Sequence, residues 1–98
     1  SQSGYDREHQ LVERLLVSAM IEARSCERFR LLSVHIEDDD LKLFYKNLMI
    51  SEAGHFRLFL DLALKYKTKE YVMKRWTEYI NFEAEMIQTL ELRGDRVH

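Results

Sequence analysis

Uninterrupted helical periodicity is the feature that most constrains what this chain can fold into. None of the 98 residues is proline and only three are glycine, and these are the two residue types that most disfavour helices. Apolar residues recur every three to four positions through three segments, about residues 8–33, a second that ends near residue 65, and residues 69–92. Helices longer than 20 residues span about 30 Å, a length typical of helical bundles. The sequence therefore predicts an all-α fold, an antiparallel helical bundle.

Residues that cap helices stand at the breaks between these segments. Asp38 or Asp39 can accept a hydrogen bond from the first turn of the second helix, and Thr68 can do the same for the third. Gly94 is expected to end the third helix. The apolar faces of the first two segments are wide, so we expect a second layer of partner helices to cover them. The stripe that the first segment is expected to bury comprises Leu11, Leu15, Ala19, Cys26 and Phe29.

Charge and cysteine content narrow the function classes. The formal net charge is −2, so no overall positive field points to nucleic acid or to an anionic membrane. Cys26 is the only cysteine, which excludes an intrachain disulfide and suits a reducing cytoplasm. No apolar run reaches the length of a membrane span, and the first residues carry no signal-peptide core. We expect a cytoplasmic protein with no membrane association.

Three ionisable residues interrupt the apolar stripes of the first two segments. Glu52 and His55 lie three residues apart, and the rest of their stripe is Leu, Phe and Met. Glu22 occupies a stripe position on the first segment. A buried carboxylate without a partner is costly, so these positions need an explanation.

A bound metal is one explanation. Di-iron carboxylate bundles take a Glu from one helix and a Glu-x-x-His motif from its neighbour, and they repeat the set on a second helix pair. Glu22 and Glu52 lie equally far from a turn centred near residue 37, so an antiparallel hairpin would place them at one level. The alternative is a buried Glu–Arg or Glu–His network, for which the chain offers Arg24, Arg28 and Arg57.

Three stretches carry a family resemblance: IEARSCERF (21–29), LFYKNLMISEAGHFRLFLDLA (43–63) and ELRGDRVH (91–98). With them the chain resembles the C-terminal half of the 2-methylthio-N6-isopentenyladenosine tRNA hydroxylases, which are ferritin-like di-iron monooxygenases. The resemblance implies that Glu22, Glu52 and His55 are metal ligands and act catalytically through the metal. It also implies that residues 1–98 form one ferritin-like domain, half of a four-helix di-iron bundle plus a C-terminal helix. We expect this domain to be the C-terminal part of a longer protein.

The activity that the resemblance implies is O2-dependent hydroxylation of the isopentenyl side chain of a modified adenosine in tRNA. It requires two iron ions per complete site, O2 as co-substrate and an external electron donor. Only three of six expected protein ligands are present, so an N-terminal half or a second chain must supply the others. An alternative is a half-ferritin that forms an iron-binding or iron-oxidising site by homodimerisation. Gly54 departs from the family, in which we expect Arg at this position in many relatives.

Two further groups of residues are candidates for supporting roles. Glu27 and Arg28 follow Glu22 by five and six positions and could form hydrogen bonds that orient Glu22 or His55. Basic residues near the second break are interleaved with aromatic residues, a combination that suits contact with RNA, although a charged turn is usually just solvated. These RNA-contact candidates are Lys65, Lys67, Lys69, Lys74 and Arg75.

Overall fold

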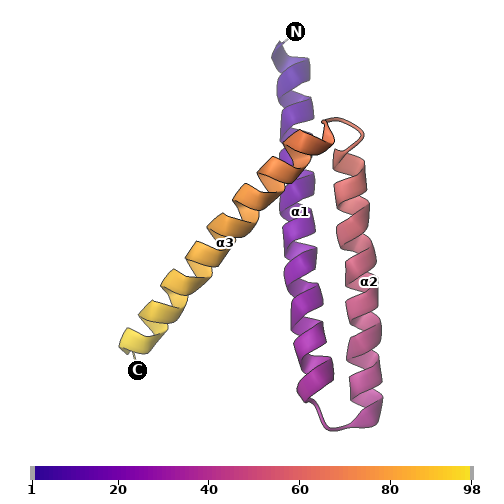
Figure 1. Ribbon diagram of the computed structural model, residues 1–98, viewed down its shortest axis with the longest axis vertical. Coiled ribbons are helices and arrows are strands. Elements are labelled where there is room, and N and C mark those ends of the chain that lie inside the picture. The colour runs from indigo at the N-terminus through magenta and orange to yellow at the C-terminus, as the bar shows by residue number, and fades with distance from the viewer. Residues whose placement is uncertain (1, 98) are drawn as a thin grey trace.

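The computed structural model describes the backbone of residues 2–97 and the side chains of residues 7–91. It contains three helices, α1 (Gln2–His35), α2 (Asp39–Ala63) and α3 (Lys69–Val97), and no strand within the described range. Helices α1 and α2 lie side by side and antiparallel, joined by the short turn of residues 36–38 (Figure 1). The predicted all-α helical architecture is confirmed.

Capping residues set the starts of α2 and α3. The carboxylate of Asp38 accepts a hydrogen bond of 3.0 Å from the backbone N–H of Leu41. The hydroxyl of Thr68 accepts one of 3.1 Å from the backbone N–H of Tyr71. Each bond pairs a donor that the first turn of a helix leaves without an intrahelical partner. Both predicted capping positions are confirmed, with Asp38 rather than Asp39 as the first cap.

The prediction that α3 ends at Gly94 is wrong, because the helix continues to Val97. No described glycine has a positive φ angle, so no left-handed residue terminates the helix. Glycine lacks a Cβ atom and tolerates left-handed backbone, but it adopts the helical conformation as well, at a cost of about 1 kcal/mol relative to alanine. A glycine near a helix end is therefore a permissive stop, not an obligatory one.

The core forms where all three helices meet. The predicted burial of Leu11 is wrong, since it remains 39% exposed, and Leu15 is only half-buried. Val12 and Leu16 of α1 form one cluster with Ala63 at the end of α2 and Val72 of α3, so the most buried residues of α1 are those that face both other helices. The fully buried residues are Val12, Leu16, Ala19, Ala63 and Val72.

Helix α3 covers only part of the hairpin. It begins beside α1 and then runs obliquely away from it, so that its C-terminal end lies far from the hairpin (Figure 1). The ring of Trp76 packs on Phe56 of α2 at 5.2 Å between centroids, and Glu83 pairs with Arg24 of α1 at 3.5 Å. Part of the wide apolar faces of α1 and α2 is left exposed in the described chain. It includes Ile21, Leu31, Leu43, Phe44, Ile50 and Leu58.

Candidate metal centre

Glu22 of α1 meets Glu52 and His55 of α2 on the seam of the hairpin. One ligand atom from each of the three side chains lies within 4.8 Å of the other two. The Nδ1 atom of His55 lies 3.8 Å from Oε2 of Glu22 and 3.8 Å from Oε1 of Glu52. The three side chains therefore converge on one point between two helices.

Local geometry accounts for this convergence. Residues three apart on a helix lie on the same face, so Glu52 and His55 point in one direction. The short α1–α2 turn keeps the two helices antiparallel and in register, which brings Glu22 to the same level. The level match predicted from a turn centred near residue 37 is confirmed by the distances between the three side chains.

The carboxylates of the cluster are mostly shielded from solvent, whereas the imidazole is not. Glu22 retains 23% and Glu52 21% of side-chain exposure, while His55 retains 54%. The Oε2 atom of Glu22 is inaccessible to solvent and accepts no hydrogen bond from any described residue. A buried acceptor left without a partner costs about 1–3 kcal/mol. The fold thus holds an oxygen atom in a position that favours an added cation.

The chemistry of the three donor groups fits iron. Carboxylate and imidazole groups suit iron, manganese and zinc, and a divalent cation offsets the charge of two neighbouring carboxylates. The competing Glu–Arg network is absent at this point among the described residues, and Arg24 is directed to Glu83 instead. The distances of 3.8 Å from His55 are too long for hydrogen bonds, so the imidazole does not satisfy Glu22.

Two residues predicted to orient the ligands lie elsewhere. Glu27 accepts hydrogen bonds of 2.9 and 2.6 Å from Arg30 on the exposed face of α1, and these lower the pKa of its carboxyl. Arg28 is also exposed, and it makes no described contact with the cluster. This corrects the prediction for Glu27, whose carboxylate is directed to Arg30 and not to Glu22 or His55.

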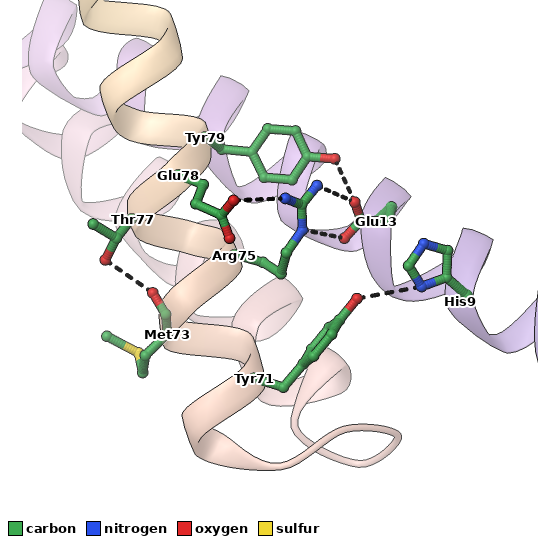
Figure 2. A network of polar contacts seen from close by, with 8 residues as sticks. All are labelled: His9, Glu13, Tyr71, Met73, Arg75, Thr77, Glu78 and Tyr79. Atoms are coloured by element: carbon green, nitrogen blue, oxygen red, sulfur yellow. Dashed lines mark hydrogen bonds and ion pairs between the residues drawn. The ribbon is translucent and has the colours of Figure 1, made fainter.

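Arg75 is also committed to an internal partner. Its guanidinium forms an ion pair with Glu13 of α1, including a hydrogen bond of 3.2 Å from Nε, and Tyr79 donates a hydrogen bond of 2.9 Å to the same carboxylate (Figure 2). The hydrogen bonds from Arg75 lower the pKa of the Glu13 carboxyl, and burial raises the pKa of the Tyr79 hydroxyl. Arg75 therefore joins α3 to α1, which corrects its assignment to RNA contact.

The remaining basic candidates divide into one packed residue and three free ones. The ammonium of Lys67 lies 5.4 Å from the centroid of the Tyr71 ring, and this side chain is half-buried. Lys65, Lys69 and Lys74 are exposed, and no ion pair of theirs is found among the described side chains. The structure thus leaves three of the five predicted basic residues available to an external ligand.

Gly54 borders a groove between α1 and α2. The groove has a volume of about 470 Å³, and Cys26, Ile50 and Arg57 also line it. The thiol of Cys26 lies 3.5 Å from the carbonyl oxygen of Met49, a weak hydrogen bond that suits a packed residue better than a reactive one. A Cβ atom at position 54 would meet no atom within 4 Å. The packing of this chain therefore gives no steric reason for glycine.

Within the described residues, no helix is both apolar enough and long enough to cross a membrane. Two antiparallel helices with convergent carboxylate and imidazole groups on their seam define the class of protein, a helical hairpin with a candidate metal-ligand cluster. Comparison with known proteins narrows this class. The tRNA-(MS[2]IO[6]A)-hydroxylase (MiaE) family matches residues 4–98, and the chain belongs to this family.

Two curated relatives bear names of the same kind. The chain is 45% identical over 80 residues to the tRNA 2-(methylsulfanyl)-N(6)-isopentenyladenosine(37) hydroxylase of Pseudomonas putida. It is 39% identical over 77 residues to the enzyme of that name from Salmonella typhimurium. These matches cover 81% and 79% of the chain but only 38% and 28% of the relatives, so the chain spans well under half of their length. No solved structure matches the chain significantly.

Proposed function

We propose that this chain supplies half of a ferritin-like di-iron centre in an enzyme that hydroxylates the isopentenyl side chain of a modified adenosine in tRNA. Family membership and the names of the two relatives support the reaction and the tRNA substrate. One observation carries the metal assignment. The Oε2 atom of Glu22 lies close to Glu52 and His55, is buried, and accepts no hydrogen bond from a described residue.

Each residue of the cluster has a distinct role in this proposal. Glu22 and Glu52 would provide anionic oxygen ligands, and a bound cation would offset their charge. His55 provides a neutral nitrogen ligand, and its place on α2 fixes its spacing from Glu52. Bound iron would supply the redox chemistry with O2 that hydroxylation of a C–H bond requires.

The open side of the cluster shows what the rest of the enzyme must contribute. His55 is more than half exposed, whereas a site for oxygen chemistry has to exclude bulk water. The proposal therefore includes a covering pair of helices that adds the other three ligands, from an N-terminal half or from a second chain. Hydroxylation by O2 forms one alcohol and one water, so two electrons must come from an external donor. We place this chemistry in the cytoplasm.

The test is iron content and tRNA hydroxylation of the full-length native protein, compared with Glu52→Ala. We expect the wild type to bind two irons and to form the hydroxylated nucleoside, and the variant to lose most of both. Asp61→Ala is the matched control, because it removes an exposed carboxylate from the same helix. Unchanged hydroxylation in Glu52→Ala, or a wild type that binds no iron, would contradict the proposal.

A second candidate function is suggested by two observations. The chain holds only half of the ligands of a complete site, and an exposed apolar face lies beside them. Two copies of this chain could pair and complete a four-helix iron site, as in a half-ferritin. This alternative predicts that ferrous iron converts 98-residue chains into symmetric dimers that oxidise iron without turning over tRNA. Native mass with and without iron separates the two functions.

A further inference from the structure

The two ends of the α1–α2 hairpin carry opposite charge. Four consecutive acidic residues, 37–40, occupy the turn between α1 and α2 and the first residues of α2. Lysines gather in sequence around the turn between α2 and α3, which lies at the opposite end of the hairpin (Figure 1). The 25 residues of α2 separate the two ends by about 37 Å at 1.5 Å per residue. That separation exceeds the Debye length of about 10 Å at 0.1 M salt, so an anion close to one end is screened from the other.

Only some of the basic side chains at this end are exposed and able to contact a ligand. Arg75 is bound to Glu13, and Lys67 packs against Tyr71, which leaves Lys65, Lys69 and Lys74. Lys65 follows the C-terminus of α2, where the helix dipole favours a cation, but Lys69 is the first residue of α3, where the dipole disfavours one. Helix stability therefore accounts for Lys65 and not for Lys69.

An aromatic side chain accompanies these lysines. Tyr66 lies in the same turn and is 46% exposed, whereas Tyr71 and Trp76 pack against the core. Exposed aromatic rings beside cations suit single-stranded RNA, whose phosphates pair with lysines and whose unpaired bases stack on rings. A partner that offers only anionic groups would make no use of Tyr66.

We propose that the end of the molecule formed by Lys65, Tyr66, Lys69 and Lys74 is the docking surface for the RNA backbone. The inference rests on the proposed function and adds to it the direction from which the substrate approaches. Lys65 follows His55 by ten positions, eight of them in α2 and two in the turn that follows, which is about 15 Å at 1.5 Å per residue. A stacked nucleic-acid strand covers this distance in about four or five nucleotides. The acidic turn repels RNA from the opposite end, so the charge pattern orients the complex.

The experiment measures binding of an isopentenylated anticodon stem–loop RNA to the full-length native protein by fluorescence anisotropy across a salt series. The test variant is Lys65→Glu/Lys69→Glu. The control is Lys42→Glu/Lys46→Glu, which makes the same charge change at two exposed lysines near the acidic end of α2. We expect the test variant to raise Kd by about tenfold or more and to lower the salt slope by about 1 to 2, because each lost phosphate contact lowers that slope by roughly 0.7–0.9. The control should stay within about twofold of wild type.

Several outcomes would overturn the docking surface. Equal losses in the test and control variants would show a general charge effect, and an unchanged salt slope in the test variant would show that the lysines do not meet phosphate. Loss of binding to anionic phospholipid vesicles without loss of RNA binding would assign the surface to a membrane. If Lys65→Glu/Lys69→Glu has reduced helicity by circular dichroism, Lys65→Gln/Lys69→Gln replaces it, with a smaller rise in Kd and the same direction of change in slope. Binding is measured without turnover, so a wild type that binds RNA at this end but hydroxylates nothing contradicts only the proposed function.

Discussion

The surroundings of Glu22 distinguish the two explanations of the cluster, a metal site and a network of polar side chains. The Oε2 atom of Glu22 is buried and accepts no hydrogen bond from a described residue, and a second carboxylate lies close by. We expect Glu22→Gln to leave the metal-free protein as stable as wild type, or up to about 1 kcal/mol more stable, because an uncompensated buried charge is removed. The same change should abolish the rise in melting temperature that ferrous or manganous ion gives the wild type.

The measurement is thermal unfolding under anaerobic conditions, with and without metal. Glu27→Gln serves as the control, since it neutralises an exposed carboxylate on the same helix that is paired with Arg30. A metal-free Glu22→Gln protein that melts well below wild type would show that Glu22 is satisfied by the protein, and it would argue against a metal at this position.

Gly54 offers a second residue-scale prediction. A Cβ atom added here meets nothing within 4 Å, and the residue lies inside α2. Gly54→Ala should therefore raise the free energy of unfolding by about 0.5–1 kcal/mol, since alanine loses less backbone entropy on helix formation. Urea unfolding checks the change. A loss of stability would show that another part of the protein closes on the groove at this position.

Sequence predicted the metal-ligand candidates better than it predicted the Glu13–Arg75 pair. Glu22, Glu52 and His55 could be brought together from spacing, because a short turn fixes the register of neighbouring helices. Glu13 and Arg75 are 62 residues apart, and their meeting depends on the angle at which α3 crosses α1. Helical spacing within one segment carries no information about that angle. The metal role of the cluster itself stays a prediction.

At the scale of elements, the pair of Glu13 and Arg75 is the main polar link between α1 and α3 in the described part of the chain. The hydrogen bonds from Arg75 hold the pKa of Glu13 below its usual value of 4.5. A lowered carboxyl pKa contributes stability that is present above the unfolded pKa and is lost as the pH falls through the folded one. The link should therefore hold at neutral pH and weaken in acid below about pH 4.5.

Glu13→Gln tests this link. We expect a loss of about 1–3 kcal/mol in the free energy of unfolding at pH 7, where the charged hydrogen bonds are intact. The loss should shrink as the pH falls below 4.5, because the unfolded wild-type chain then takes up a proton at Glu13, whereas the folded carboxyl, with its lowered pKa, is protonated only at lower pH. Unfolding by urea at a series of pH values measures it. Glu78→Gln is the control, since it removes a more exposed carboxylate that also contacts Arg75. A loss that does not change with pH would show that packing, and not charge, joins the helices.

The starts of α2 and α3 could be predicted from sequence, whereas the buried face of α1 could not. Asp38 and Thr68 could be identified as caps from sequence because a cap involves only the next few residues. The buried face of α1 could not, since it depends on where α3 lies, and this contact buries Val12 and Leu16 in place of Leu11. Local chemistry therefore determined the ends of the helices more reliably than it determined their orientation.

At the scale of the whole molecule, the described chain is thin and incompletely covered. Its shortest dimension is 20 Å, about two helix diameters, and large apolar side chains remain exposed on all three helices. Helical spacing places Phe44 and Leu58, which are 54% and 53% exposed, on the same face of α2 as His55. The open side of the ligand cluster and the exposed apolar side chains thus lie on one surface, which is where a covering helix pair would pack.

Removing that apolar surface should weaken metal binding without touching a ligand. In Phe44→Ser/Leu58→Ser the three candidate ligands remain, but the proposed covering helices would lose about 1–2 kcal/mol of apolar burial at each position. We expect iron affinity, measured by equilibrium titration of the full-length native protein, to fall by about tenfold or more. The matched control is Leu43→Ser/Ile50→Ser, whose two side chains are each 58% exposed but lie on a different face of α2. This control should retain wild-type affinity, because its face is turned away from the cluster. If the two variants lose equal affinity, the apolar surface beside His55 is not where the site is completed.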